Sequence, residues 1–204
     1  MAEETGNKNC GYFDLAIYGK YDRNYWLFVE MKETATLRDL DCFLRDIWVE
    51  CCGHLSAFEI DGTCYSISPQ NDFFWGRIEK NMNCKLNTVL KKGMTFDYEY
   101  DFGSTTELMI TVVNYRIGID RKEKLVILSR NNPIELVCDK CGKKPAAYMC
   151  AKYDYETIEY LCADCAKTHE CEEEMLFDVC NSPRMGVCGY CGSEIYPDQF
   201  VPDV

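Results

Sequence analysis

Two Cys-x-x-Cys pairs, Cys138/Cys141 and Cys162/Cys165, are separated by 20 residues in the C-terminal third of the chain. This spacing is typical of a four-thiolate zinc site, in which each pair supplies two corners of a tetrahedron. Gly142 follows the first pair, where a turn that directs backbone amides toward sulfur often needs a positive φ. The second pair opens the helix-compatible run ADCAKTH. The sequence therefore predicts that a metal ion organises this part of the chain.

Further donor side chains beyond residue 131 suggest a second metal site. The hypothesis is a second zinc ion bound by Cys150, His169, Cys171 and Cys188, with Cys191 as an alternative ligand. The competing interpretation is that His169 caps a helix and the cysteines are buried thiols. A shell of four protein ligands leaves no open position for water, so one or two structural zinc ions are expected.

The 15 cysteines raise the question of disulfides. An odd count, metal-type spacing and a polar, acidic start without an apolar segment argue against a secreted disulfide framework. No stretch approaches the roughly 18 apolar residues that span a bilayer. We therefore expect a cytoplasmic protein with reduced or metal-bound thiols and no membrane partner.

The charge distribution disfavours nucleic acid as a partner. The formal net charge is −12, and residues 172–204 carry seven acidic side chains against one basic residue, Arg184. Proteins that bind nucleic acids usually show a basic surface, because neutralisation of phosphates dominates their affinity. We expect Arg184 to pair with a carboxylate.

The first 133 residues predict a sheet with one helix. Aromatic and β-branched runs separated by turn residues indicate strands, and Asp61-Gly62 indicates a hairpin turn. Thr36 and Asp39 form a capping-box pattern at the start of a helix. The apolar stripe of this helix repeats every three or four residues, at Leu37, Leu40, Phe43, Leu44, Ile47, Trp48 and Cys51.

These elements predict the α+β class: a mainly antiparallel sheet with one long amphipathic helix, plus a small zinc-binding C-terminal module. The sequence Asn131-Asn132-Pro133 marks the expected boundary. The predicted domains are therefore residues 1–133 and a cysteine-rich module with an acidic tail, residues 134–204.

Residues 36–113 resemble the plasmid pRiA4b open-reading-frame-three-like family. The resemblance rests on LRDLDCFLRDIWVECCGHLSAFEI and on LNTVLKKGMTFDYEYDFGSTTELMI. Many members have YDFGD followed by Trp and His, where this chain has Ser104, Thr106 and Leu108. The chain is instead similar to a subgroup with YDFGSTTEL and a cysteine-rich extension that ends in NSPRMGVCGY. The resemblance implies little about function, because the family is uncharacterised.

Three functional hypotheses follow. The first is a non-catalytic binding module with a protein partner, for which Phe73-Phe74-Trp75 is the candidate surface. The second is a nucleic-acid-binding protein associated with mobile elements, which the charge disfavours. The third is an enzyme with a carboxylate or thiol site. The third requires one pocket that gathers Asp101, Glu107 and His54, or a thiol of Cys51-Cys52 activated by His54.

Overall fold

The structure is a computed structural model that describes residues 8–69, 78–151, 158–170 and 175–201. Its contacts divide the chain into two units. The first unit contains residues 1–43, 54–130 and 202–204, and the second contains residues 44–53 and 131–201. The division into domains 1–133 and 134–204 stays a prediction, since contact units do not test independent folding. None of the described helices is long and apolar enough to cross a membrane.

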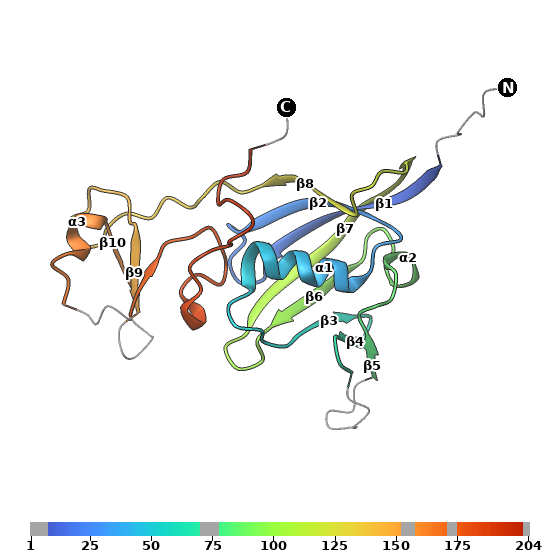
Figure 1. Ribbon diagram of the computed structural model, residues 1–204, viewed down its shortest axis with the longest axis horizontal. Coiled ribbons are helices and arrows are strands. Elements are labelled where there is room, and N and C mark those ends of the chain that lie inside the picture. The colour runs from blue at the N-terminus through green and yellow to red at the C-terminus, as the bar shows by residue number, and fades with distance from the viewer. Residues whose placement is uncertain (1–7, 70–77, 152–157, 171–174, 202–204) are drawn as a thin grey trace. The chain divides into compact units, whose positions relative to one another are not determined.

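The first unit is built on an eight-stranded sheet in the order β5-β4-β3-β6-β7-β1-β2-β8 (Figure 1). All neighbouring strands pair antiparallel except β4 and β5, which pair parallel. The strands are β1 (Asn9–Gly19), β2 (Trp26–Lys32), β3 (Ser56–Ile60), β4 (Thr63–Ser66), β5 (Ile78–Asn81), β6 (Thr95–Tyr100), β7 (Thr106–Ile119) and β8 (Leu125–Arg130).

Local sequence signals account for several of these connections. Asp61 and Gly62 join β3 to β4 with φ angles of 48° and 72°, which confirms the predicted two-residue hairpin turn. A single turn of helix, α2 (Leu86–Val89), precedes β6, and Gly93 follows it with φ 87°. Alternating strand residues face the core, where Leu15, Ile17, Leu27 and Leu108 have no exposed surface.

Helix α1 (Leu37–Leu44) covers one face of this sheet (Figure 1). It begins with the predicted capping box: Thr36 Oγ1 accepts the Asp39 amide at 3.1 Å, and Asp39 Oδ2 accepts the Thr36 amide at 2.8 Å. The apolar stripe is buried as expected, with Leu37, Leu40 and Leu44 fully enclosed.

The fold-class prediction is wrong about a long amphipathic helix. The longest helical stretch of the described residues, α1 followed directly by the π-helix η1 (Arg45–Val49), covers only 13 residues, while strands hold 41% of the chain and helices 14%. The apolar stripe continues to Cys51, but the chain turns extended at Glu50. The Trp48 carbonyl accepts a hydrogen bond from the Ser182 hydroxyl at 2.6 Å. In a longer helix this carbonyl would accept a backbone amide of the next turn, so Ser182 replaces that bond where the helix ends.

A buried carboxylate ties α1 to the sheet. Asp41 is 1% exposed, and its Oδ1 accepts the Ser56 hydroxyl of β3 at 2.6 Å and the Tyr98 hydroxyl of β6 at 2.9 Å. A buried carboxylate is stable only when donors replace the water that it has lost. Asp41 therefore fixes the position of the helix along the sheet.

The second unit contains a three-stranded antiparallel sheet in the order β10-β9-β11. Its strands are β9 (Tyr148–Ala151), β10 (Ile158–Leu161) and β11 (Leu176–Asp178), and its helical turns are η1, α3 (Ala163–Ala166) and the 3₁₀ turn η3 (Val187–Gly189). The Trp48 side chain of η1 is buried and donates from Nε1 to the Asn181 carbonyl at 3.1 Å. Segment 44–53 is thus held within this unit by Asn181 and Ser182.

The Asp41 cluster yields a prediction about stability. Replacement of Asp41 by alanine removes the acceptor of two buried hydroxyls and should lower the free energy of unfolding by about 3 kcal/mol, because hydrogen bonds to charged groups contribute about 1.5–3 kcal/mol each. Tyr98→Phe removes one of these bonds and should cost less. Denaturant unfolding of both variants and of the double mutant measures the coupling; strictly additive losses would contradict a shared hydrogen bond.

Candidate metal centre

The structure brings together the thiols of Cys138, Cys141, Cys162 and Cys165, whose sulfur atoms all lie within 4.8 Å of one another. Tetrahedral zinc with Zn–S bonds near 2.3 Å requires sulfurs about 3.8 Å apart. Cys138 and Cys162 are buried, and the other two are half-buried. The arrangement and the donor chemistry can hold one metal ion, and its four sulfurs can complete a tetrahedral shell.

The first pair lies in a tight turn whose backbone faces the thiols. The Cys138 amide donates a hydrogen bond to the Lys144 carbonyl at 2.9 Å, and the Gly142 amide donates one to the Cys138 carbonyl at 2.8 Å. Gly142 has φ 62°, the left-handed conformation that the sequence predicted. Val137 and Pro145 form a bridge that closes the base of this turn.

The second pair lies where β10 runs into α3. Cys162 occupies the position before the first turn of α3 in extended backbone, and Cys165 lies inside the helix. The Asp139 amide donates to the Tyr160 carbonyl at 2.8 Å, and the Tyr160 amide donates to the Asp139 carboxylate at 2.6 Å. These two bonds join the first turn to β10 and so bring the two thiol pairs together.

Backbone amides lower the pKa of some of these thiols, whereas neighbouring thiols raise the pKa of others. The Cys162 amide lowers the pKa of the Cys138 thiol to about 6, and the Lys144 amide lowers the pKa of the Cys141 thiol. The Cys162 thiol, by contrast, raises the pKa of Cys165 to about 12. Four adjacent thiols cannot all carry negative charge without a cation between them. A bound divalent metal removes this conflict.

The residues of the hypothesised second site are distributed differently. Cys150 is buried in the apolar core that surrounds Cys138 and Cys162. His169 Nδ1 lies 3.9 Å from the Glu159 carboxylate, and its buried Nε2 has no hydrogen-bond partner among the described residues. Cys171 lies outside the described residues, so a site with these ligands stays a prediction.

Cys188 instead joins a second thiol group in the second unit. Its sulfur lies 3.7 Å from that of Cys52, which lies 3.6 Å from that of Cys51. All three sulfurs lie within 4.8 Å of one another. The neighbouring thiols of Cys51 and Cys188 raise the pKa of Cys52 to about 12. Sequence reasoning missed this group because its halves are 136 residues apart.

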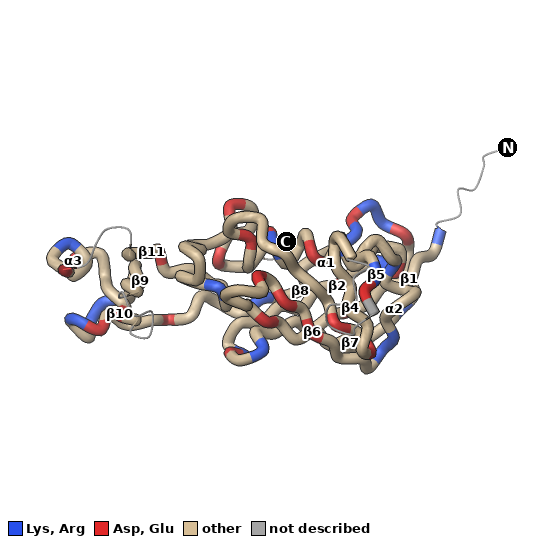
Figure 2. The backbone as a smooth tube through the Cα atoms, turned by 90° about the horizontal axis from the view of Figure 1, so that it is seen from below, with Lys and Arg blue, Asp and Glu red and all other residues tan. Residues whose placement is uncertain are grey.

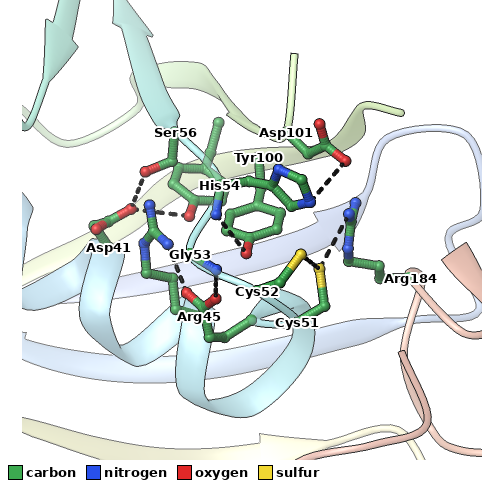
Figure 3. Close-up of polar contacts among 12 residues, drawn as sticks. Asp41, Arg45, Cys51, Cys52, Gly53, His54, Ser56, Tyr100, Asp101 and Arg184 are labelled. Carbon is green, nitrogen blue, oxygen red and sulfur yellow. Dashed lines mark hydrogen bonds and ion pairs between the residues drawn. The ribbon is translucent and has the colours of Figure 1, made fainter. Parts of the chain in front are cut away.

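Arg184 lies beside this second group. Its side chain is fully buried, and its Nη2 lies 3.4 Å from the Cys51 sulfur. Figure 3 shows the Arg184 side chain directed toward Cys51. The Ser182 hydroxyl accepts the Arg184 amide at 2.9 Å while it donates to the Trp48 carbonyl. Arg184 thus contacts a thiol, and its expected pairing with a carboxylate stays a prediction.

The residues of the enzyme hypothesis are only partly gathered. His54 Nε2 lies 3.6 Å from the Asp101 carboxylate, and the His54 amide donates to the Tyr100 hydroxyl at 3.3 Å (Figure 3). Glu107 instead accepts Lys20 Nζ at 2.7 Å, and this bond lowers the pKa of Glu107. His54 and Asp101 therefore lie together, whereas Glu107 is paired with Lys20.

The fold and the thiols define a sheet protein with an appended unit that can hold metal. Residues 19–137 match the family model described as plasmid pRiA4b ORF-3-like protein. The chain belongs to this family, which confirms the resemblance seen in the sequence. The matched segment ends one residue before Cys138, so the four-thiol cluster lies beyond the part that the family model describes.

A solved structure has a similar fold. It is the crystal structure of a protein of unknown function, MM3350, from Methanosarcina mazei Go1, with 15% sequence identity and a TM-score of 0.50. The match covers 59% of this chain and 69% of the other chain. At this identity the likeness concerns the fold alone. No curated protein matches the chain.

The turn at Gly142 yields a prediction about metal affinity. Gly142→Ala meets no atom within 4 Å of the added Cβ, so its cost is backbone strain at φ 62°, about 1–2 kcal/mol. Because folding of the turn and metal binding are coupled, zinc affinity should fall roughly 5- to 30-fold. Competition with a chromophoric chelator measures this loss. Gly142→Asn, which tolerates the left-handed conformation better, should lose less, and an unchanged affinity for the alanine variant would exclude the coupling.

Proposed function

We propose that this protein is a non-catalytic binding protein whose C-terminal unit is folded by a structural zinc ion at Cys138, Cys141, Cys162 and Cys165. The observation that carries the proposal is the close grouping of four thiols from two Cys-x-x-Cys turns. Four sulfur ligands complete a tetrahedral shell and leave no position for a reacting water. The metal in this proposal therefore stabilises the fold and does not catalyse.

The donor set supports zinc as the ion. Four thiolates in tetrahedral geometry favour zinc or an iron–sulfur centre over magnesium or calcium, which prefer oxygen ligands. The thiols bind metal only while they are reduced, so the proposal also places the protein in a reducing compartment, the cytoplasm.

The proposed partner is a protein with a basic surface. The chain carries a net charge of −12, and its last 33 residues hold seven acidic side chains and one basic side chain. Figure 2 shows acidic and basic positions interspersed along the described chain. The excess of negative charge repels the phosphates of nucleic acids and attracts a cationic protein. Phe73-Phe74-Trp75, the candidate contact surface, lies outside the described residues.

Removal of one zinc ligand tests the structural role of the metal. Cys162→Ala should lose one zinc ion per chain, and the amides of β9, β10 and β11 should lose protection from hydrogen exchange, because metal binding there supplies folding free energy. The amides of β1 and β7 should stay protected by the core of the first unit. Cys64→Ser, in β4, serves as the control. Unchanged protection of β9 to β11 in Cys162→Ala that has lost this zinc ion would refute the proposal.

Paired baits test the kind of partner. Zinc-loaded protein and the Cys162→Ala variant are each incubated with nuclease-treated extract of the source cells. We expect a protein that the loaded form retains, that the variant loses, and that salt releases because the contact is electrostatic. Anisotropy with random DNA and RNA at about 50 mM salt should show no binding. Tight nucleic-acid binding, or equal retention by both baits, would contradict the proposed partner.

A further inference from the structure

The second thiol group has the dimensions of a metal site. The distances of 3.6 Å between the sulfurs of Cys51 and Cys52 and 3.7 Å between those of Cys52 and Cys188 are close to the edge of a zinc–sulfur tetrahedron, about 3.8 Å. They are far longer than the bond of a disulfide, about 2.05 Å. Two chain segments distant in sequence supply these thiols.

The sequence around Cys188 resembles that of the first site, but its backbone takes a different turn. Cys188 starts a third Cys-x-x-Cys-Gly sequence, which ends at Cys191 and Gly192. Cys188 itself has φ 53°, which is uncommon for a residue with a side chain, and Gly189 has φ 73°. Such a conformation persists only where its surroundings hold it. Cys191 lines the same surface pocket as Cys51 and Cys188.

Arg184 supplies the compensating charge. Three thiolates around a divalent cation leave a net charge of −1, which a nearby guanidinium neutralises. Arg184 is fully buried, and its Nη2 lies 3.4 Å from the Cys51 sulfur. Hydrogen bonds to ligand sulfurs orient them and tune the metal that they hold. A buried arginine aimed at a thiol group is therefore a second observation in favour of an anionic site.

We propose that Cys51, Cys52 and Cys188 bind a second zinc ion, independent of the ion at the first site. Cys191 follows Cys188 by three residues, a spacing that lets it supply the fourth donor. The ion cross-links the two chain segments of the second unit, residues 44–53 and 131–201. This site shares no ligand with the four-thiol cluster, so the two can fail separately.

Zinc content of the reduced, full-length protein tests this site. Native mass spectrometry should find two zinc ions per chain in the wild type and one in each of Cys188→Ser and Cys52→Ser. Cys42→Ser removes an exposed thiol outside the group and should retain two. Cobalt substitution gives a second measurement. Cys188→Ser should remove the part of the thiolate-to-cobalt charge-transfer band that comes from the second site, and Cys162→Ala should remove the part that comes from the four-thiol cluster.

The outcomes separate this inference from the proposed function. One zinc ion in the wild type, lost in Cys162→Ala and kept in Cys188→Ser, would overturn the second site and leave the first intact. A Cys52–Cys188 disulfide in protein purified without reductant, with no metal taken up after reduction, would also overturn it. Loss of one ion from both Cys188→Ser and Cys52→Ser, with the Cys42→Ser content unchanged, supports it.

Discussion

In the proposed account the second unit depends on a cation shared by four thiols, which repel one another as they ionise. Its sheet has strands of four, four and three residues, and the buried core beside the thiols consists of Cys138, Cys150, Leu161 and Cys162. Other residues of the unit, such as Trp48 and Met149, are also buried, but the apolar cluster around the thiols is by itself too small to offset the conformational entropy that this part of the chain loses on folding. In this account the free energy of metal binding supplies the difference, as it does in other small metal-dependent folds.

The first unit is stabilised in a different way. Eight strands and helix α1 bury a large apolar core, and two buried carboxylates, Asp41 and Glu30, have partners inside this unit. Asp41 joins α1 to β3 and β6 through two hydroxyls. Glu30 is 2% exposed and forms ion pairs with Arg116 and Arg121. The family match covers residues 19–137, which include most of this sheet, and the four-thiol cluster follows the matched segment.

Structural features that depend only on neighbouring residues in the chain were predicted correctly from the sequence. The Asp61-Gly62 hairpin, the capping box of Thr36 and Asp39, and the positive φ of Gly142 are set by neighbours in the chain. The end of the helix was not predictable, because Trp48 bonds to Ser182, 134 residues later. The grouping of Cys188 with Cys51 and Cys52 was missed for the same reason. The spacing Cys188-x-x-Cys191 was the available signal, but it does not reveal that Cys51 and Cys52 lie beside Cys188.

The most direct test of the account is X-ray absorption at the zinc edge of the purified, reduced protein. Sulfur should dominate the first shell, with zinc–sulfur distances of about 2.3 Å. A shell of oxygen and nitrogen at about 2.0–2.2 Å, or a reduced protein that binds no zinc, would contradict the claim that thiolate–metal bonds hold the C-terminal unit together.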